Sequence, residues 1–153
     1  MNVPQDMSEV CDPKTAEMCR GIGRLVGRVR VELLDALDAE LAPFDVTSAQ
    51  YIILAALAEG GVDSASGLCR GVSYDPGAMT RMIDRLEHKG FIRRVACAED
   101  RRKARLELTA EGKAVYPKLN AGASKVFNRY LRGFSRTEAR QLQGLLERML
   151  ANA

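Results

Sequence analysis

The segment from Ser73 to Thr109 constrains the fold of this chain more than any other. Asp75 suits the N-cap of a helix, because its carboxylate accepts hydrogen bonds from unpaired backbone N–H groups, and Pro76 suits the first helical position. Gly90 suits the left-handed residue that ends such a helix. These signals predict a helix that begins at Pro76 and stops before Gly90.

The predicted helix is amphipathic. Met79, Ile83 and Leu86 recur at helical spacing and mark its inner face. The residues turned outward are then Gly77, Ala78, Thr80, Arg81, Asp84 and Arg85. Such a face, small near its N-terminus and carrying Arg and Thr, is suited to enter the major groove of DNA and to touch base edges.

Two β-prone runs follow this helix. The first spans 91–95, and the second, 105–108, alternates as a half-buried strand does. The connection between them carries five charged residues, Glu99, Asp100, Arg101, Arg102 and Lys103. A hairpin with a basic tip beside a groove-reading helix is the plan of a winged helix-turn-helix.

Three motifs in this segment resemble the MarR family of bacterial transcription regulators. They are the string Asp84-Arg85-Leu86-Glu87-His88-Lys89-Gly90, the wing string Asp100-Arg101-Arg102, and Leu108-Thr109-Ala110-Glu111-Gly112. Residues and spacing both match, and the order of helices fits along nearly the whole chain. The resemblance implies a mainly α fold with a small β-hairpin wing, in which a winged helix-turn-helix domain is flanked by N- and C-terminal dimerisation helices.

Length and charge agree with this interpretation. A chain of 153 residues with 46% hydrophobic content buries one ordinary core, so we expect a single domain over 1–153. From Arg70 to Arg105 there are ten Lys and Arg against five Asp and Glu, a local net charge of +5, whereas the remainder carries −2. This basic footprint favours a nucleic-acid partner over a solvated surface without one.

The rest of the chain is predicted to be helical. An apolar stripe at helical spacing marks a long first helix, with Ile22, Val26, Val29, Leu33 and Leu37 on one face. Capping boxes begin two further helices at Thr47 and Ser135, and Thr109 caps another, in which Pro117 predicts a bend. The lobe 47–108 is then the winged helix-turn-helix, and the resemblance implies that 14–42 and 109–153 are dimerisation helices.

Each predicted contact with DNA follows from side-chain chemistry or from the resemblance. Arg81 and Arg85 lie one helical turn apart, so either reaches a guanine edge or a phosphate, and Asp84 is expected to orient one of them. Thr80 and Ala78 suit a thymine methyl group. Near the helix start, where phosphates favour the positive dipole end, stand Ser73 and Tyr74, and Gly77 belongs to the small outward face that is expected to approach the DNA. The resemblance implies that Arg101 or Arg102 enters the minor groove, with Asp100 fixing the guanidinium.

The resemblance also implies a homodimer on a nearly palindromic operator and a small aromatic or phenolic anion as signal. That ligand would bind between the dimerisation helices and the DNA-binding lobe. The candidate residues for it are Arg24, Arg28, Phe44 and Tyr51. We therefore predict a homodimeric repressor that such a ligand releases from DNA.

The four cysteines form no C-x-x-C pair, so no zinc ribbon is indicated, and we expect free thiols in a reducing compartment. Cys69 is predicted to be a core residue. Cys97 stands beside arginines that favour its thiolate, and Cys19 is reminiscent of peroxide-sensing relatives, so both are redox candidates. A thiol-oxidation sensor on the same scaffold is thus one alternative, and a winged-helix protein-interaction module without DNA affinity is another.

Other functional classes receive little support from the sequence. No run of residues has the length and hydropathy of a membrane span, and the N-terminus lacks the apolar core of a signal peptide, so a cytoplasmic location is expected. His88 is the single histidine and fits a surface role near a helix C-terminus. We find no catalytic constellation, metal-ligand motif or cofactor motif, and expect no enzyme activity.

Overall fold

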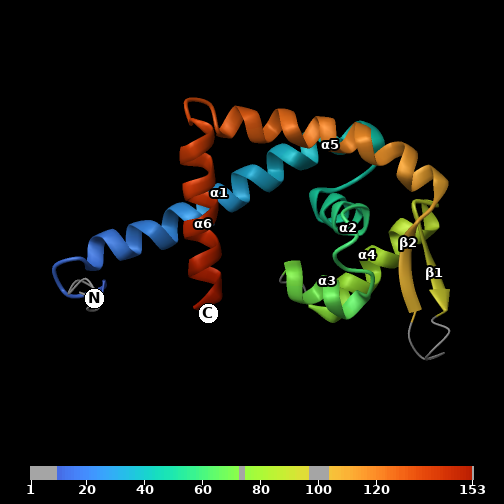
Figure 1. The fold of residues 1–153 in the computed structure, drawn as a ribbon, viewed down its shortest axis with the longest axis horizontal. Coiled ribbons are helices and arrows are strands. Elements are labelled where there is room, and N and C mark those ends of the chain that lie inside the picture. Colours follow the sequence, from blue (N-terminus) through green and yellow to red (C-terminus); the bar gives the residue numbers. More distant parts are fainter. Residues whose placement is uncertain (1–9, 73–74, 97–103, 153) are drawn as a thin grey trace, which may run out of the picture.

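The computed structural model describes residues 10–72, 75–96 and 104–152. Figure 1 shows a helical molecule with one antiparallel hairpin, as predicted. In chain order the elements are α1 (Ala16–Leu41), the 3-10 helix η1 (Ala42–Phe44), α2 (Ser48–Ala58), α3 (Ala65–Val72), α4 (Pro76–His88), β1 (Ile92–Ala96), β2 (Ala104–Leu108), α5 (Ala110–Tyr130) and α6 (Arg136–Ala151).

The predicted helix starts are confirmed by their caps. Both capping boxes form, at Thr47 with Gln50 and at Ser135 with Glu138. Thr109 caps α5 by accepting a hydrogen bond from the backbone N–H of Gly112. Pro117 lies inside α5, which stays one helix and curves towards the hairpin in Figure 1. Local side-chain chemistry therefore sets where these elements begin.

One hydrophobic core holds the DNA-binding lobe together and reaches the end of α1 and the middle of α5. Fully buried side chains come from every element of the lobe, among them Ile53, Leu54, Leu68, Met79, Ile83, Leu86 and Ile92. Leu41 and Leu119 join them from α1 and α5. Cys69, predicted to be a core residue, is only partly buried and packs against this core.

The hairpin pairs Ile92 with Leu108 and Arg94 with Leu106. The segment between α2 and α3 adds to its edge, because the backbone N–H of Leu106 donates to the Asp63 carbonyl at 2.7 Å. The Asp63 carboxylate also accepts from Arg105 Nε at 2.7 Å. The second strand is therefore fastened to the lobe as well as to its partner strand.

The base of the hairpin is a close junction between α4, β1 and α5. Gly90 adopts φ +76°, the left-handed conformation that ends α4. The Thr109 hydroxyl donates to the Gly90 carbonyl, and the Thr109 N–H donates to the Phe91 carbonyl at 3.0 Å. Gly112 packs so tightly here that a Cβ on it would overlap the Phe91 carbonyl oxygen.

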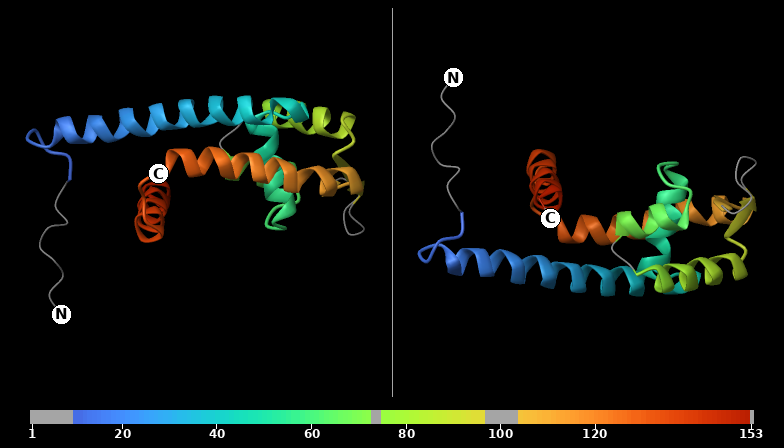
Figure 2. Two further views of the ribbon diagram at one scale, coloured as in Figure 1. Left: turned by 90° about the horizontal axis from the view of Figure 1, so that it is seen from above. Right: turned by 90° about the horizontal axis from the view of Figure 1, so that it is seen from below.

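The long helices leave the lobe as an extended arm. Figure 2 shows α1 and α5 running side by side, with α6 turning off at the far end of α5 while α1 continues beyond it. Only the C-terminal part of α1 packs on the core of this chain. Leu37 is buried, whereas Ile22, Val26 and Val29 are 40–52% exposed. In this single chain α6 buries none of its residues.

The expectation of free thiols is wrong for Cys11 and Cys19, which form a disulfide. The chain turns back before α1, because the Asp12 carboxylate accepts hydrogen bonds from the backbone N–H groups of Lys14 and Thr15, both at 2.8 Å. This turn brings the two cysteine Cα atoms to 6.1 Å, within the range that a disulfide spans. The two cysteines stand at positions i and i+8, so no short cysteine motif revealed the pair.

Within the described ranges, no single helix has the length and apolar composition needed to cross a membrane. One bent pair, Ala16–Phe44 with Ser48–Ala58 at 79°, meets that test by length and composition alone.

We predict that Gly112→Ala destabilises the protein by about 3 kcal/mol, because the added methyl group forces α5 away from the Phe91 carbonyl. Gly61→Ala is the control, since a Cβ there meets nothing within 4 Å. Urea unfolding followed by circular dichroism measures both. A Gly112→Ala protein as stable as the control would contradict the close approach at this junction.

Candidate nucleic-acid interface

Helix α4 presents one face to the core and the other to solvent. Asp75 caps it by accepting from the Ala78 N–H at 2.9 Å, and Pro76 takes the first position, as predicted. Met79, Ile83 and Leu86 are buried. Of the residues predicted to face outward, Ala78 is half-buried, and the exposed ones are Gly77, Thr80, Arg81, Asp84 and Arg85.

The two arginines of this face are well placed for a polyanion. Neither Arg81 nor Arg85 forms an ion pair within the part of the chain that the structure describes. The Arg81 guanidinium lies over Gly77, with Nη1 3.5 Å from where a Cβ of that glycine would stand. Glycine at this position thus leaves room for the Arg81 side chain at the N-terminal end of α4.

Asp84 does not orient Arg81 or Arg85, so that prediction is wrong. Its carboxylate accepts from Arg94 of β1 at 2.5 Å, and Glu87 binds the same guanidinium. Arg94 also donates its backbone N–H to Glu87 at 3.1 Å. These contacts raise the pKa of Arg94, with the Asp84 hydrogen bond as the main cause.

This arrangement has two consequences for the interface. Arg94 offsets one of the two negative charges that Asp84 and Glu87 bring to α4. It also ties the hairpin to this helix. This role of Arg94 was not predicted from the sequence. The two-residue period of a strand does put Arg93 and Arg94 on opposite faces, so that one of them points towards α4.

A further anchor holds the end of α4. The Lys89 ammonium forms an ion pair with the Asp45 carboxylate at 3.0 Å and also contacts the Asp45 carbonyl. It reaches Gln50 Oε1 at 3.4 Å. The side chain of Lys89 is 23% exposed, which places these contacts at the edge of the core and joins α4 to the start of α2.

Several predicted site residues lie outside the described residues. They are Ser73 and Tyr74 before α4, and Cys97, Asp100, Arg101 and Arg102 in the wing connection. The strands that carry this connection are described, and Figure 1 shows them beside α4, where β2 leads into α5.

The four residues predicted to bind a ligand are not gathered into one cavity. Arg28 pairs with Glu32 at 2.7 Å on the exposed side of α1, and Arg24 is exposed one turn earlier. Phe44 packs half-buried against the core. Tyr51 is buried, stacks on Tyr116 and donates its hydroxyl to Asn120 Oδ1 at 3.0 Å. Burial raises the pKa of Tyr51 and of Tyr116.

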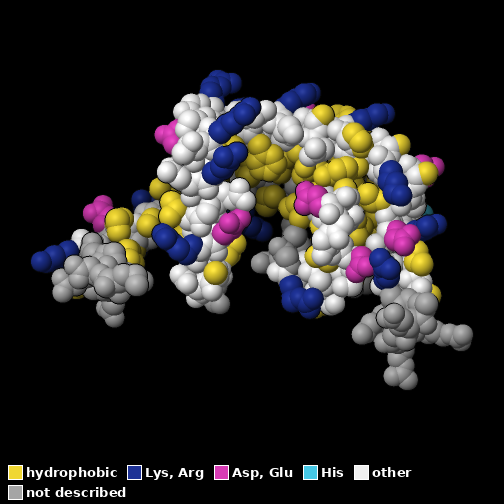
Figure 3. Space-filling model, viewed as in Figure 1, with side chains coloured by type: hydrophobic (Ala, Val, Ile, Leu, Met, Phe, Trp, Pro, Cys, Tyr) yellow, Lys and Arg dark blue, Asp and Glu magenta, His cyan; other side chains and the backbone are white. Residues whose placement is uncertain are grey.

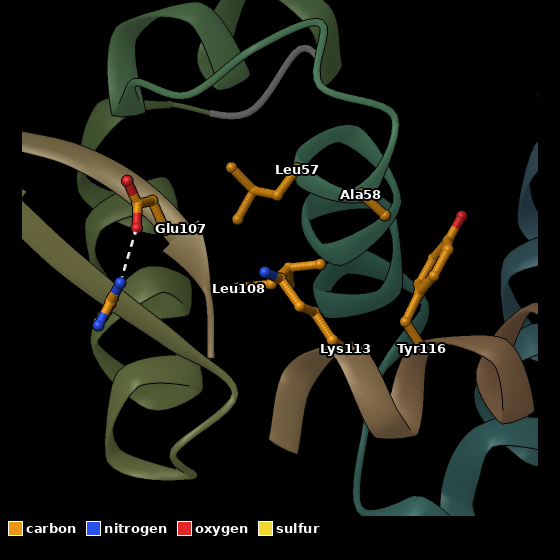
Figure 4. A pocket seen from close by; sticks show the side chains of 7 residues that line it. Leu57, Ala58, Glu107, Leu108, Lys113 and Tyr116 are labelled. Carbon is orange, nitrogen blue, oxygen red and sulfur yellow. Dashed lines mark hydrogen bonds and ion pairs between the residues drawn. The ribbon is translucent and has the colours of Figure 1, made fainter. Parts of the chain in front are cut away.

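A different cavity opens between the lobe and the arm. It has a volume of about 550 Å³ and lies between the end of α2, the hairpin and the first turns of α5. Figure 4 shows the side chains that line it, which are Leu57, Ala58, Arg93, Glu107, Leu108, Lys113 and Tyr116. Among the described residues, no three His, Cys, Asp or Glu side chains form a group that could hold a metal ion.

The fold, with two exposed arginines on α4 beside a two-stranded hairpin, defines a winged helix-turn-helix protein of the class that binds DNA. A sequence model of the MarR family matches residues 46–104. The chain is 30% identical over 130 residues to the multiple antibiotic resistance protein MarR of Salmonella typhimurium, covering 84% of this chain and 90% of that protein.

Solved structures show the same fold. A mutant MarR from E. coli complexed with operator DNA has a TM-score of 0.76 at 27% identity, covering 92% of this chain and 99% of that one. CouR from Rhodococcus jostii bound to p-coumaroyl-CoA has a TM-score of 0.77 at 26% identity, covering 84% and 90%. This chain belongs to the MarR family. It is a DNA-binding transcriptional regulator and not an enzyme.

Proposed function

We propose that this protein is a homodimeric, cytoplasmic repressor that binds a palindromic operator and is released from it by a small aromatic or phenolic ligand. The observation that carries the DNA-binding part is the exposed face of α4, where Arg81 and Arg85 stand without ion-pair partners among the described residues. The related MarR complexed with operator DNA supports this assignment. The related CouR bound to p-coumaroyl-CoA supports a ligand-responsive regulator.

In this proposal α4 enters the major groove, and the wing residues Asp100, Arg101 and Arg102 reach the flanking minor groove. Arg81 and Arg85 read base edges or clamp phosphates, and Thr80, Ala78 and Gly77 allow close approach to the bases. Ser73 and Tyr74 are proposed to contact phosphates at the start of the helix. An operator covered in this way is unavailable to RNA polymerase, which makes the regulator a repressor.

We predict that Arg81→Ala and Arg85→Ala each weaken operator binding by about 1–3 kcal/mol. Lys118→Ala, which removes a charge from the exposed side of α5, is the control and should bind normally. Fluorescence anisotropy with a labelled operator, repeated over a salt series, measures both affinity and salt dependence. The slope of log affinity against log salt should be about −0.9 for each neutralised phosphate.

Two outcomes would contradict the DNA-binding proposal. If both arginine variants bound the operator as tightly as the unmodified protein, α4 would not be the reading helix. If binding did not depend on salt, the chain would fit the alternative of a protein-interaction module.

The dimer is supported by apolar surface that the single chain leaves open. A groove of about 570 Å³ runs between α1, α5 and α6, lined by Val29, Leu33, Phe127, Leu142 and Leu146 among others. Figure 3 shows hydrophobic side chains gathered in the hollow beneath α5. Large apolar patches of this kind mark interfaces on soluble proteins, and a second copy covers them symmetrically. The dimerisation helices are proposed to span 14–42 and 109–153.

We predict that Leu146→Glu converts the dimer into monomers with much weaker operator affinity, because it places a charge in a dry interface. Gln141→Glu adds a charge on the opposite side of α6 and is the matched control. Light scattering coupled to size-exclusion chromatography measures the mass of each variant. A monomeric unmodified protein at micromolar concentration would contradict this proposal.

One observation favours a second candidate, a thiol-redox sensor on the same scaffold. The Cys11–Cys19 disulfide closes a turn at the start of α1, where Thr15 Oγ1 also donates to the Val10 carbonyl at 2.6 Å. When a peroxide oxidises the pair, the two thiols lose two electrons and two protons, and the peroxide is reduced to water or to an alcohol and water. Cys19 was already a redox candidate, and Cys97 remains one outside the described residues.

If oxidation is the signal, we predict that hydrogen peroxide releases the unmodified protein from its operator but does not release Cys11→Ser or Cys19→Ser. Cys69→Ser is the control, since that thiol lies outside the pair. Cys97→Ser tests the wing thiol in the same gel-shift titration. Peroxide that releases the two disulfide variants as well would exclude this pair as the sensor, and an unmodified protein that stays bound would contradict oxidation as the signal.

A further inference from the structure

We infer that Lys89 is a positioning residue that couples α4, the proposed DNA-reading helix, to α1 of the arm and thereby sets the half-site spacing that the regulator accepts. The inference rests on the proposed function, a dimer on a palindromic operator. Lys89 is the C-cap of α4 and follows the exposed Arg85 by one helical turn. Only 23% of its side chain is exposed, so it packs against the lobe instead of extending into solvent.

The ammonium group of Lys89 binds three acceptors on the segment 42–50. It pairs with the Asp45 carboxylate at 3.0 Å, contacts the Asp45 carbonyl and reaches Gln50 Oε1 at 3.4 Å. A lysine ammonium has three N–H donors and no acceptor, so these contacts use its full capacity. Among the described residues, they are also the only hydrogen bonds and ion pairs between α4 and this segment.

Both acceptor residues are held in place by their own neighbours. Asp45 ends η1 in the left-handed conformation, with φ +54°, and its N–H donates to the Ala42 carbonyl at 2.9 Å. Aspartate is one of the few residue types besides glycine that adopt this conformation. Gln50 is buried, and its Oε1 also accepts from the Thr47 N–H at 3.2 Å in the capping box of α2. Lys89 therefore binds groups whose positions are fixed.

The same segment is joined to the end of α1. η1 follows α1 without a break, and the Asp38 carboxylate of α1 accepts from the Ser48 N–H at 2.5 Å. A series of polar contacts thus runs from Asp38 through the start of α2 to Lys89. Hydrogen bonds depend on direction, whereas the burial of apolar surface does not. Apolar packing therefore holds α4 on the lobe, and the contacts of Lys89 fix its angle to α1.

This angle matters because α1 carries apolar surface that the proposed dimer covers. Ile22, Val26 and Val29 are exposed on the half of α1 that extends beyond the lobe. When this surface is fixed in a two-fold interface, a rotation of α4 relative to α1 changes the separation of the two copies of α4. Dimers with a reading helix in each subunit bind half-sites at a defined separation. Loss of the Lys89 contacts therefore broadens the range of separations that the dimer accepts.

The test compares operators whose half-site separation differs by one base pair, or about 3.4 Å. A palindrome selected by the unmodified protein is the reference, and one base pair is added to or removed from its centre. We expect the unmodified protein to bind the altered operators at least about tenfold more weakly, and Lys89→Met to bind all three within about threefold of one another. Methionine keeps a long unbranched side chain but has no N–H donor. Lys118→Met, on the exposed side of α5, is the matched control and should keep the preference of the unmodified protein.

Asp45→Gly covers the case in which Lys89→Met does not fold. Glycine adopts φ +54° without steric cost, and the Asp45 side chain is 91% exposed, so this change leaves the core intact. It removes the ion pair and should weaken the spacing preference as Lys89→Met does. If Lys89 only stabilised the fold, its loss would lower the melting temperature and leave the spacing preference unchanged. That result overturns the inference.

A measurement without DNA separates this inference from the proposed function. Nitroxide labels at Arg24→Cys on α1 and Arg81→Cys on α4, in a chain whose four natural cysteines are replaced by serine, report the angle between the two helices. Double electron–electron resonance on labelled protein diluted with unlabelled protein measures the distance within one chain. We expect a narrow distance distribution that Lys89→Met broadens. Equal distributions overturn the inference, whereas failure of the unmodified protein to bind any palindrome overturns the proposed function and leaves this measurement to decide the role of Lys89.

Discussion

The junction at the base of the hairpin is the contact on which the rest of this structure depends. Three elements meet where Gly112 of α5 packs against the backbone of Phe91, and Thr109 fastens the strand end to Gly90. Gly90 turns the chain out of α4, β1 starts at once, and β2 leads directly into α5. Because these connections are only a few residues long, this junction fixes the angles between α4, the hairpin and the arm formed by α1 and α5.

Ion pairs also help to fix the orientation of the elements that meet at this junction. Arg94 joins the hairpin to α4, Arg105 joins it to Asp63, and Lys89 joins α4 to the start of α2. Each of these pairs is partly exposed, so each alone contributes little to the free energy of folding. Their value lies in orientation, since they give the lobe a defined shape at the surface that faces DNA while apolar packing below supplies its stability.

The sequence predicted the elements well because their signals are local. Helix caps at Thr47, Asp75, Thr109 and Ser135, together with the glycine stop at Gly90, lie within a few residues of the boundaries that they set. The exposed face of α4 was also predicted correctly, because the helical period is a local signal. The partner of Asp84 did not, because it comes from a strand ten residues away, whereas the prediction considered only neighbours on the same helix.

The helical spacing of apolar residues also did not indicate which apolar faces are buried within one chain. It placed Ile22, Val26 and Val29 on the same face as Leu37, yet Leu37 is buried and the other three lie on an arm that the lobe does not cover. A ligand cavity depends on the spacing between elements, which is why the cavity beside Lys113 could not be predicted from the composition of α1 and α2. The disulfide required a turn built by Asp12 and Thr15, and the turn rather than the cysteine spacing brings the two thiols together.

The absence of any buried residue in α6 has a consequence for how this sequence can change over time. Substitutions in the lobe must fit the hydrophobic core that the chain forms by itself. Substitutions along α6 and the first half of α1 do not have to fit that core. Only the surface that covers these two segments limits them. The two regions are therefore limited by different contacts, the lobe by its own core and α6 by the surface that covers it.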